Sequence, residues 1–295
     1  MAPSSAPTHG IEVARTREEV RAFRLKLSRE GQTLGLVPTM GALHEGHLSL
    51  IRLAAKEADV VAASLFVNPT QFAAHEDFGS YPRREADDIG MLEAAGCRLV
   101  YCPQLTEIYP PGDSTRVRVG ALSEDLEGAI RPHFFEGVAS VVTRLFAHLG
   151  PDLAVFGEKD YQQLLVIRAL TQDLGFPIRI LGGPTQRDPD GLAMSSRNAY
   201  LGAAERRQAG ALPAALQQAC KRLAAGEAIR DVCDDARSHL LSAGFSSVDY
   251  IEARHAETLS PLETGSAPAG VPGRILAAAR LGTTRLIDNL PFQRS

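Results

Sequence analysis

Between residues 34 and 181, short apolar runs alternate with amphipathic helical segments, and this alternation constrains the fold more than any other feature. The runs that indicate buried strands lie at residues 34–37, 60–67, 98–102, 153–156 and 177–181. The segments that indicate helices lie at residues 47–58, 84–95, 136–149 and 160–174. Strands that alternate with helices predict βαβ units and a mainly parallel sheet. We therefore expect an α/β fold with a Rossmann-like, doubly wound parallel sheet.

A further helix is expected ahead of the first strand. Thr16 and Glu19 have the spacing of a capping box, in which each side chain satisfies a backbone N–H at the start of the helix. Val20, Phe23 and Leu27 then form one apolar face.

The pattern changes after a loop at residues 182–198. An Ala-rich helix is expected at residues 203–225 and a second helix at 229–243. Strands are expected at residues 247–253 and 274–281, separated by a turn rich in Pro, Gly, Ala and Ser at 266–273. We therefore predict two domains, a Rossmann-like ligand-binding domain at residues 1–183 and a smaller C-terminal α+β domain at 184–295, hinged near residues 184–201.

Composition narrows the class of partner. The chain has 295 residues and a formal net charge of −4, which argues against nucleic acid because nucleic-acid binders usually present a basic face. The longest apolar stretch, residues 60–67, is far shorter than the ~20 residues that a membrane span requires. Residues 1–10 lack the pattern of a secretory signal, and we expect them to form a frayed tail.

The cysteines favour a cytoplasmic protein with reduced thiols. They are few, they form no CxxC pair, and we expect them to be small buried side chains without a metal or redox role. They are Cys97, Cys102, Cys220 and Cys233.

The sharpest feature is the segment at residues 38–47, Pro-Thr-Met-Gly-Ala-Leu-His-Glu-Gly-His, which follows a strand and opens a helix. A helix N-terminus presents backbone N–H groups and partial positive charge, which suit a phosphate. Gly41 and Gly46 let the backbone approach a ligand closely. His44 and His47 can face one point, where imidazole can donate a hydrogen bond to phosphate or protonate a leaving oxygen. With an ordinary pKa of ~6.5, they would make the reaction pH-dependent in that region.

Two alternatives stand beside phosphate binding for this pair of histidines. They could ligate zinc, but no third Cys, His or acidic ligand stands at a recognisable metal spacing. The segment is also not HExxH, because Glu45 lies between the histidines at the wrong interval. The histidines could instead be two solvent-facing side chains. The strand, glycines and helix around them favour phosphate binding.

Two further loops carry groups suited to phosphate. Residues 156–163 lie between a strand and a helix, where Lys159 can neutralise phosphate and Asp160 can accept from ribose hydroxyls. Residues 190–198 place Ser195, Ser196 and Arg197 in one loop, and Arg binds oxyanions bidentately. Alone, each segment is better explained as a polar helix cap. Loops after parallel strands meet at one edge of a sheet, so we expect those after residues 37, 67, 156 and 181 to line one site.

Four segments in this order, PTMGALHEGHL, FVNPTQF, FGEKDYQQL and DGLAMSSRN, resemble the pantothenate synthetase (pantoate–β-alanine ligase) family. That family belongs to the nucleotidyltransferase superfamily with a HIGH-type histidine motif, here at residues 44–47. The resemblance extends from about residue 34 to Arg-Leu-Ile-Asp-Asn at 285–289. The four segments together are specific to the family, whereas HxGH alone indicates only the superfamily.

The resemblance implies a ligase that condenses (R)-pantoate with β-alanine and converts ATP to AMP and diphosphate, with Mg²⁺. The pantoate carboxylate attacks the α-phosphorus and pyrophosphate leaves; the β-alanine amine then attacks the pantoyl-adenylate and AMP leaves. Adenylation supplies the carboxylate with a good leaving group, and a dry site protects the mixed anhydride. The resemblance also implies a homodimer and a C-terminal domain that closes over ATP.

Residue roles follow by the same resemblance. His47 is the proton donor, with His44 and Lys159 as the other catalytic groups. Gln71, Gln163 and Met40 hold pantoate, and Gln71 also lies near β-alanine. The residues implied to bind ATP are Pro38, Met40, Gly41, Ala42, Leu43, His44, Glu45, Gly46, His47, Gly157, Glu158, Lys159, Asp160, Gln186, Met194, Ser195, Ser196 and Arg197.

Asp87 and Asp88 match acidic positions that the family links to Mg²⁺, although a solvated helix face is the favoured interpretation here. One segment departs from the family pattern, in which Arg-x-Gly-His-Phe precedes Gly-Val. This chain has Phe134 at the family's histidine position and His133 one place earlier. We expect Phe134 to fill the volume of the histidine, and His133 to supply any missing polar contact.

Two other functional classes stay open. An adenylyl- or cytidylyltransferase that shares HxGH would transfer a nucleotide to phosphate, but Gln71 and Gln163 are neutral groups suited to a small hydroxy acid. A non-catalytic nucleotide-binding regulator would need defects in the histidine, lysine or serine loops, and the sequence has none.

Overall fold

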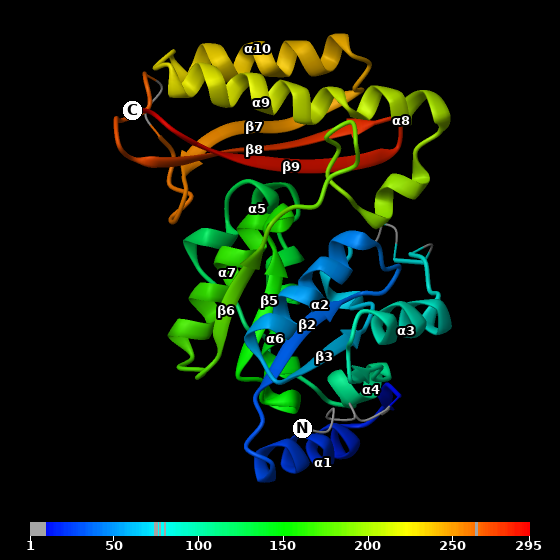
Figure 1. Ribbon diagram of the computed structural model, residues 1–295. Coiled ribbons are helices and arrows are strands. Elements are labelled where there is room, and N and C mark those ends of the chain that lie inside the picture. The colour runs from blue at the N-terminus through cyan, green and yellow to red at the C-terminus, as the bar shows by residue number, and fades with distance from the viewer. Residues whose placement is uncertain (1–9, 74–75, 77, 80, 263–264) are drawn as a thin grey trace, which may run out of the picture.

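The computed structural model of the chain describes residues 10–73, 76, 78–79, 81–262 and 265–295. The tail expected at residues 1–10 lies outside this part, apart from Gly10. A parallel sheet flanked by helices forms the larger part of the molecule, and a smaller antiparallel sheet covered by helices lies across one end of it (Figure 1). The predicted fold class and the small C-terminal α+β unit are both confirmed.

The larger sheet has six strands, and every pairing within it is parallel. The strands are β1 (Glu12–Ala14), β2 (Leu34–Thr39), β3 (Val60–Leu65), β4 (Leu99–Tyr101), β5 (Leu153–Gly157) and β6 (Arg179–Gly183). Their order is β1-β4-β3-β2-β5-β6. The chain therefore leaves β2 toward one edge and β5 toward the other. In a doubly wound sheet, a crevice opens between two such strands at their carboxyl ends.

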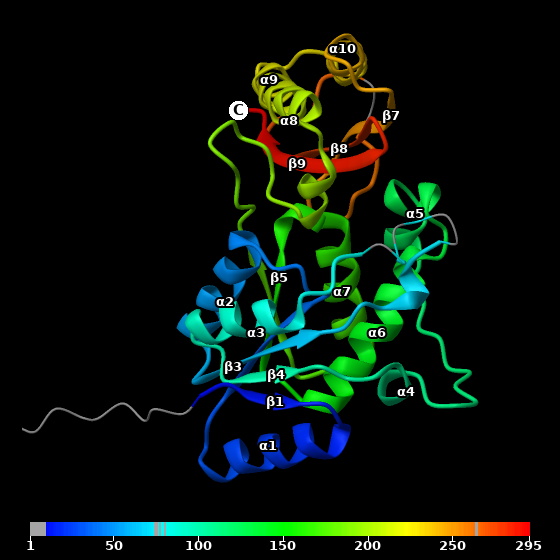
Figure 2. The ribbon, with the colours of Figure 1, turned by 90° about the vertical axis from the view of Figure 1, so that its right-hand side faces the viewer.

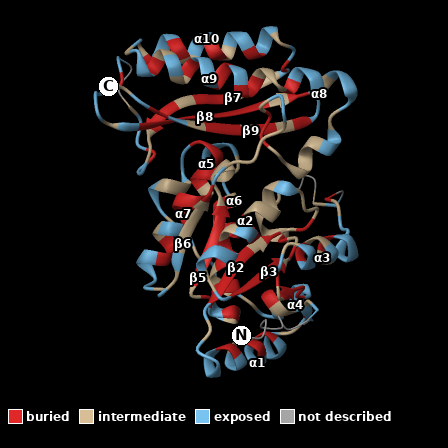
Figure 3. Ribbon diagram, viewed as in Figure 1, coloured by how far each residue is buried: buried red, intermediate tan, exposed pale blue. Residues whose placement is uncertain are grey.

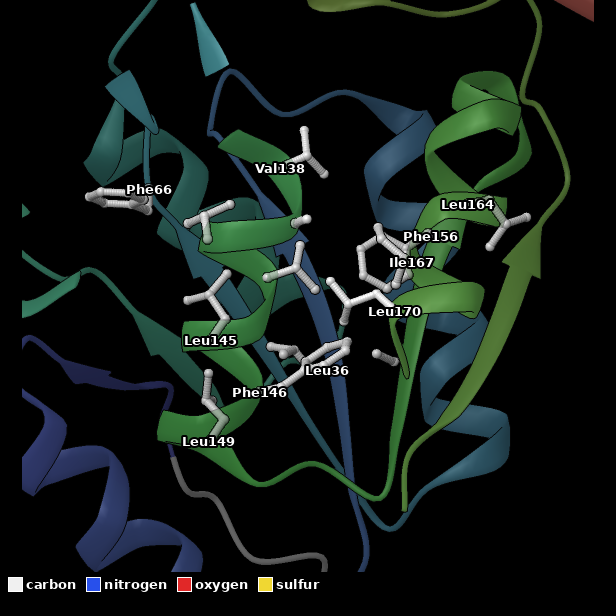
Figure 4. Close-up of a cluster of buried hydrophobic side chains, with 14 of the residues drawn as sticks. Leu36, Phe66, Val138, Leu145, Phe146, Leu149, Phe156, Leu164, Ile167 and Leu170 are labelled. Carbon is white, nitrogen blue, oxygen red and sulfur yellow. The ribbon is translucent and has the colours of Figure 1, made fainter. Parts of the chain in front are cut away.

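Helices cover both faces of this sheet, as Figure 2 shows for α2 and α3 on one side and α6 and α7 on the other. Alternate residues of each strand point to opposite faces, so Leu36 joins one core and its neighbour Val37 the other. Figure 4 shows the first core, where Phe146 of α6 packs edge-on against Phe156 of β5. The helices of the first face are α1 (Arg17–Arg29), α6 (Phe134–Leu149) and α7 (Tyr161–Asp173); those of the second are α2 (Glu45–Glu57) and α3 (Glu85–Ala94).

Local signals set the ends of several helices. The predicted capping box of α1 is confirmed: Thr16 Oγ1 accepts from the N–H of Glu19 at 3.2 Å, and the Glu19 carboxylate accepts from the N–H of Thr16 at 2.9 Å. Gly150 ends α6 in the left-handed conformation. Short elements fill the connections: α4 (Leu105–Ile108), α5 (Glu127–Ile130) and 3₁₀ turns at Pro69–Gln71, Ala121–Ser123, Glu158–Asp160 and Ser196–Tyr200.

The smaller sheet is antiparallel, with strands β7 (Ser247–His255), β8 (Pro272–Leu281) and β9 (Thr284–Gln293) in that order. Helices α9 (Ala211–Ala224) and α10 (Ile229–Ser242) pack on one of its faces, and the other face lies toward the larger sheet (Figure 1). Burial follows the same division: Figure 3 shows the strands of both sheets largely buried and the outer helix faces exposed. The predicted domain boundary at residues 183/184 coincides with the end of β6 and stays a prediction.

Three elements differ from expectation. The helix predicted at residues 203–225 is two helices, α8 (Ala203–Ala209) and α9, because Pro213 fits only in the first turn of a helix. Strand β9 was not expected, since Arg285, Asp288 and Asn289 interrupt its apolar pattern. It is an edge strand, where Pro291 is tolerated. Strand β1 has only three residues, too few for an apolar pattern.

A buried ion pair fastens the two sheets together. The carboxylate of Glu127, in α5, accepts from the two Nη atoms of Arg285 at 2.8 and 2.7 Å and from the hydroxyl of Tyr250 at 2.7 Å. Arg285 also donates to Asp249 at 2.7 Å. Burial alone would raise the pKa of Glu127, but the hydrogen bonds and charge of Arg285 hold that pKa below its usual value. The carboxylate therefore stays charged, and it ties β7 and β9 to the larger sheet.

We predict that Arg285→Met lowers the free energy of unfolding by ~3–5 kcal/mol, because the buried carboxylate loses its bidentate partner and keeps only the longer pair with Arg131 at 3.8 Å. The double variant Glu127→Gln/Arg285→Met should recover most of this loss. Arg118→Met is the matched control, since its partner Glu124 and Arg118 itself are 58% and 69% exposed and such a pair is worth ~0–1 kcal/mol. Urea unfolding measures all three, and equal losses in the two single variants would contradict the prediction.

Candidate active site

A cavity of about 780 Å³ lies between the carboxyl ends of the parallel strands and the face of the small sheet. As predicted, the loops after β2, β3, β5 and β6 all contribute to its wall. The predicted site residues that line it are Pro38, Met40, His44, Gly46, His47, Gln71, Gly157, Lys159, Asp160, Gln163, Gln186, Met194, Ser195, Ser196 and Arg197. Those that do not line it are Gly41, Ala42, Leu43, Glu45, Asp87, Asp88 and Glu158.

The two histidines stand together at the start of α2. His44 is the N-cap residue, and its Nδ1 accepts from the N–H of Gly46 at 3.1 Å. His47 Nδ1 accepts from the N–H of His44 at 3.4 Å, and the ring centroids are 4.2 Å apart. A neutral imidazole whose Nδ1 accepts carries its proton on Nε2. Each histidine therefore offers one Nε2–H donor.

Burial keeps both imidazoles neutral. It lowers the pKa of His47 to about 3, helped by His44 and Lys159, and the pKa of His44 to about 4, helped by Lys159. The expected titration near pH 6.5 is therefore wrong for the protein without ligand. Near neutral pH both histidines act as hydrogen-bond donors and carry no charge of their own.

Gly41, Ala42 and Leu43, directly ahead of His44, lie outside the cavity lining. The N–H groups of Ala42 and Leu43 donate to the carboxylate of Asp88, each at 2.9 Å. The side chain of Glu45 pairs with Arg52 on the surface. The sequence predicted that this whole segment binds a ligand; the structure places only its two ends in the cavity wall, and ligand contact stays a prediction.

Lys159 is held by the small sheet. The side-chain amide of Asn289, in β9, donates from Nδ2 to the carbonyl oxygens of Glu158 and Lys159 at 3.0 and 2.8 Å. Arg274, in β8, donates to Asn289 Oδ1 at 2.6 Å and pairs with Glu158 at 3.4 Å. Its guanidinium lies 3.6 Å from the ring centroid of Tyr161. Glu158 is therefore part of the support, while the ammonium of Lys159 reaches the cavity, 3.8 Å from Asp160.

The third loop forms another part of the cavity wall and approaches the start of α2, where a Cβ on Gly46 would lie 3.8 Å from Cβ of Met194. Ser195 Oγ accepts from the N–H of Arg197 at 3.3 Å, and Ser196 Oγ lies 3.3 Å from the hydroxyl of Tyr81. The N–H of Met194 donates to the carbonyl of Gln186 at 2.9 Å, which joins the two sides of the loop. Two hydroxyls and a guanidinium are thereby brought into the cavity wall.

Gln71 and Gln163 line the inner end of the cavity. Gln71 donates from Nε2 to the sulfur of Met40 at 3.1 Å, and its Oε1 accepts from Asn68 at 3.0 Å. Asn68 is buried and fixed by Tyr109, whose hydroxyl donates to its Oδ1 at 2.9 Å. A Cβ on Gly137 would lie 2.5 Å from the carbonyl oxygen of Thr70, so α6 approaches this turn as closely as glycine allows.

The segment that departs from the family pattern forms part of the wall. Phe134 lines the cavity, and the guanidinium of Arg131 lies 3.8 Å from its ring centroid. Arg131 also makes a bidentate pair with Glu76 at 2.6 and 2.7 Å. The expectation that His133 replaces the missing polar contact is wrong, because His133 is exposed and lies outside the cavity lining. The side chain at this position instead stacks against the guanidinium of Arg131.

Several cavity residues were not identified from the sequence as members of the site. They come from short or irregular segments, where no periodicity marks them. Asn68 lies inside the FVNPTQF segment, and residues 285–289 are the last segment of the resemblance, so the sequence held a signal for both. The main ones are Asn68, Glu76, Tyr81, Glu127, Arg131, Arg285, Asp288 and Asn289.

The acidic pair proposed for Mg²⁺ does not fit a metal. Asp87 is exposed and Asp88 is only 3% exposed, with both carboxylate oxygens bonded to backbone N–H groups. The solvated helix face is thus confirmed for Asp87 and wrong for Asp88. Within the described part of the chain, no three His, Cys, Asp or Glu side chains are grouped to hold a metal ion, and no helix is long and apolar enough to cross a membrane.

Comparisons with known proteins agree over nearly the whole chain. A profile of the family described as pantoate-beta-alanine ligase matches residues 12–291. A pantothenate synthetase from Hyphomonas neptunium is 51% identical in an alignment of 297 positions that covers 99% of this chain and 100% of that protein.

Solved structures give the same result. Pantothenate synthetase from Thermus thermophilus is 43% identical with a TM-score of 0.87, and the match covers 95% of this chain and 99% of that one. A pantoate-beta-alanine ligase from Francisella tularensis, complexed with β-γ ATP and β-alanine, is 33% identical with a TM-score of 0.80. That match covers 95% of this chain and 97% of the other.

The neutral state of the histidines can be measured directly. We predict that in the folded, ligand-free protein His44 and His47 keep the neutral Nε2–H form from pH 8 down to about pH 5.5, because burial disfavours their charged forms. In urea both should titrate near ~6.5. The unfolded chain then binds protons that the folded chain refuses, so stability falls as pH drops from about 6.5 toward about 4. Nitrogen-15 shifts of the rings give both titrations, and a folded-state pKa between 6 and 7 would contradict the prediction.

Proposed function

The chain belongs to the pantoate–β-alanine ligase family, and on that premise we propose how its cavity carries out the family's reaction. The protein condenses pantoate with β-alanine at the expense of ATP, through a pantoyl-adenylate. One observation carries the assignment of roles: two neutral imidazole donors, one ammonium and two neutral glutamine amides meet in one cavity. The donors and the cation suit a triphosphate, and the amides suit a small hydroxy acid.

In the first step, an oxygen of the pantoate carboxylate attacks the α-phosphorus of ATP. The bond from that phosphorus to the bridging oxygen breaks, and pyrophosphate leaves with the electron pair. We assign Lys159 and the Nε2–H groups of His44 and His47 to the phosphate oxygens on which this charge develops. Fixed donors in a closed cavity stabilise such charge without reorganisation. The depressed pKa values support hydrogen-bond donation by His47 rather than storage of a transferable proton.

Pantoate fits the inner end of the cavity. Its carboxylate and hydroxyls can bond to Gln71 and Gln163, which add no charge that would weaken the nucleophile. Its dimethyl group needs apolar surface, and Phe134, Val138 and Val142 supply that surface on the adjoining wall. ATP would then extend from His44 toward the loop at residues 194–197.

In the second step, the β-alanine amine attacks the pantoyl carbonyl carbon, loses a proton and displaces AMP. The intermediate is a mixed anhydride, so the cavity must exclude water until the amine arrives. We propose that Mg²⁺ enters with ATP, held chiefly by phosphate oxygens as is usual for this ion. Its chemistry is to neutralise phosphate charge. Asp160 lines the cavity and its charge acts on His44, so its carboxylate would orient water molecules around such a complex.

Three further assignments rest on the family. We propose a cytoplasmic homodimer whose partners are small molecules, and a C-terminal domain that closes over ATP.

An adenylyl- or cytidylyltransferase is the second candidate function for a HIGH-type fold. The pair of neutral glutamines beside an apolar wall favours the hydroxy acid over a phosphate acceptor.

We predict that exchange of labelled pyrophosphate into ATP requires pantoate and does not require β-alanine. Pantoate alone supplies the nucleophile for the first step, so its omission removes the only route back from pyrophosphate to ATP. Reactions that omit each acid in turn are the control. Exchange that depends on β-alanine, or no exchange in the presence of pantoate, would refute the two-step scheme.

Lys159→Ala should slow pantoyl-adenylate formation by ~10²–10³-fold, because it removes one preorganised charge from the leaving group. Lys56→Ala is the matched control, since Lys56 is an exposed lysine in the last turn of α2. Rapid-quench measurement of pyrophosphate in a single turnover gives the rate, and near-ultraviolet circular dichroism verifies the fold. A near-normal first step in Lys159→Ala would rule out the assigned role.

A further inference from the structure

We propose that Asp88 is a positioning residue that holds the backbone ahead of the two histidines, and that it is not a ligand of Mg²⁺. Asp88 lies in the first turn of α3, outside the cavity lining, and only 3% of its surface is exposed. Its Oδ2 accepts from the N–H of Ala42 and its Oδ1 from the N–H of Leu43, both at 2.9 Å. Both carboxylate oxygens are therefore engaged by the protein itself.

The loop needs such an anchor because its backbone is strained. Gly41 and Ala42 both have positive φ, +83° and +51°, and a residue with a Cβ rarely adopts that conformation. The resulting turn aims two successive N–H groups in the same direction, and one carboxylate can satisfy both. A Cβ on Gly41 would lie 2.9 Å from Asp88 Oδ2, so the carboxylate packs directly against the turn.

Two consecutive contacts connect the carboxylate of Asp88 to the histidines. Leu43 directly precedes His44, whose N–H donates to Nδ1 of His47 at 3.4 Å. The carboxylate thus fixes the peptide groups that set the position of the N-cap ring, and that residue's backbone fixes the second ring. A displacement of this loop would move both Nε2–H donors relative to the phosphates.

Asp88→Asn tests the proposal with little change in volume. The amide keeps one acceptor oxygen, but its NH₂ group then faces a backbone N–H that also donates. We expect pyrophosphate exchange to slow by ~10²-fold, the usual result of misplacing reacting groups by about 1 Å. Asp87→Asn, one residue away on the exposed side of the helix, is the matched control and should keep the normal rate.

A magnesium titration separates positioning from metal binding. If Asp88 positions the loop, Asp88→Asn lowers the maximal rate while the Mg²⁺ concentration for half-maximal activity stays normal. A rise in that concentration, with the rate restored by excess Mg²⁺, would overturn the proposal and identify a metal ligand. Normal exchange in a folded Asp88→Asn variant would overturn it as well.

A second variant relieves the strain instead of restoring the anchor. Glycine adopts positive φ without penalty, so Ala42→Gly should recover at least several-fold of the rate that Asp88→Asn loses, with Ala42→Gly alone as the reference. A metal ligand would gain nothing from that change, and no recovery would count against positioning.

The kinetic readouts rest on the proposed function, but the amide resonances do not. In the ligand-free wild type, the Ala42 and Leu43 N–H protons should lie downfield, and both should move upfield in Asp88→Asn. Unmoved amide protons would refute the anchor itself. Absence of pyrophosphate exchange in the wild type, with these shifts as expected, would instead refute the proposed function alone.

Discussion

Strands β2 and β5 are paired along Gly35–Leu153 and Leu36–Ala154, and the chain departs from them in opposite directions. No crossover covers the gap above their carboxyl ends, so the two loops that follow must face each other across it. The loop after β2 carries the histidines and the loop after β5 carries Lys159. The two loops are close enough that the charge of Lys159 helps to lower the pKa of both imidazoles. The strand order of the sheet therefore brings the two loops together, whichever side chains they carry.

The parallel sheet alone leaves this crevice open, and the small antiparallel sheet completes it. Asn289 holds the peptide groups of Glu158 and Lys159, and Arg274 holds Asn289. On the neighbouring side, Arg285 binds the buried carboxylate of Glu127. Asn289 and Arg285 lie more than a hundred positions from their partners in the larger domain, so the peptide groups around Lys159 are held by a strand near the end of the chain. The wall of the cavity therefore includes residues from both sheets.

The sequence predicted the parallel sheet and the four loops of the site, because these follow from periodicity and from motifs at strand ends. Most of the residues that the motifs and the family resemblance assigned to the site line the cavity, but much of the wall consists of residues that were not assigned. The sequence did not predict β9, whose Arg285, Asp288 and Asn289 point to partners elsewhere in the fold. The resemblance placed Ala42 and Leu43 at the ligand, and the favoured interpretation of Asp88 was a solvated helix face, although these residues bind one another. Local sequence shows which groups a segment carries, but the direction of a backbone N–H depends on φ and on neighbours from other elements.

The neutral state of the two histidines suits the reaction that we propose for the cavity. Triphosphate brings several negative charges into a site where burial already disfavours charge. If the histidines were permanent cations, they would bind ATP and pyrophosphate alike, and tight ground-state binding does not by itself speed the reaction. In the first step that we propose, neutral donors would bond weakly at first and more strongly as charge collects on the departing oxygen. Their donor direction is set by backbone N–H groups on Nδ1, so no reorganisation is needed at that moment. A low pKa of the histidines in the ligand-free protein is thus compatible with catalysis. The backbone around His44 and His47 orients their Nε2–H groups, and the proposed role needs this orientation and not a protonated ring.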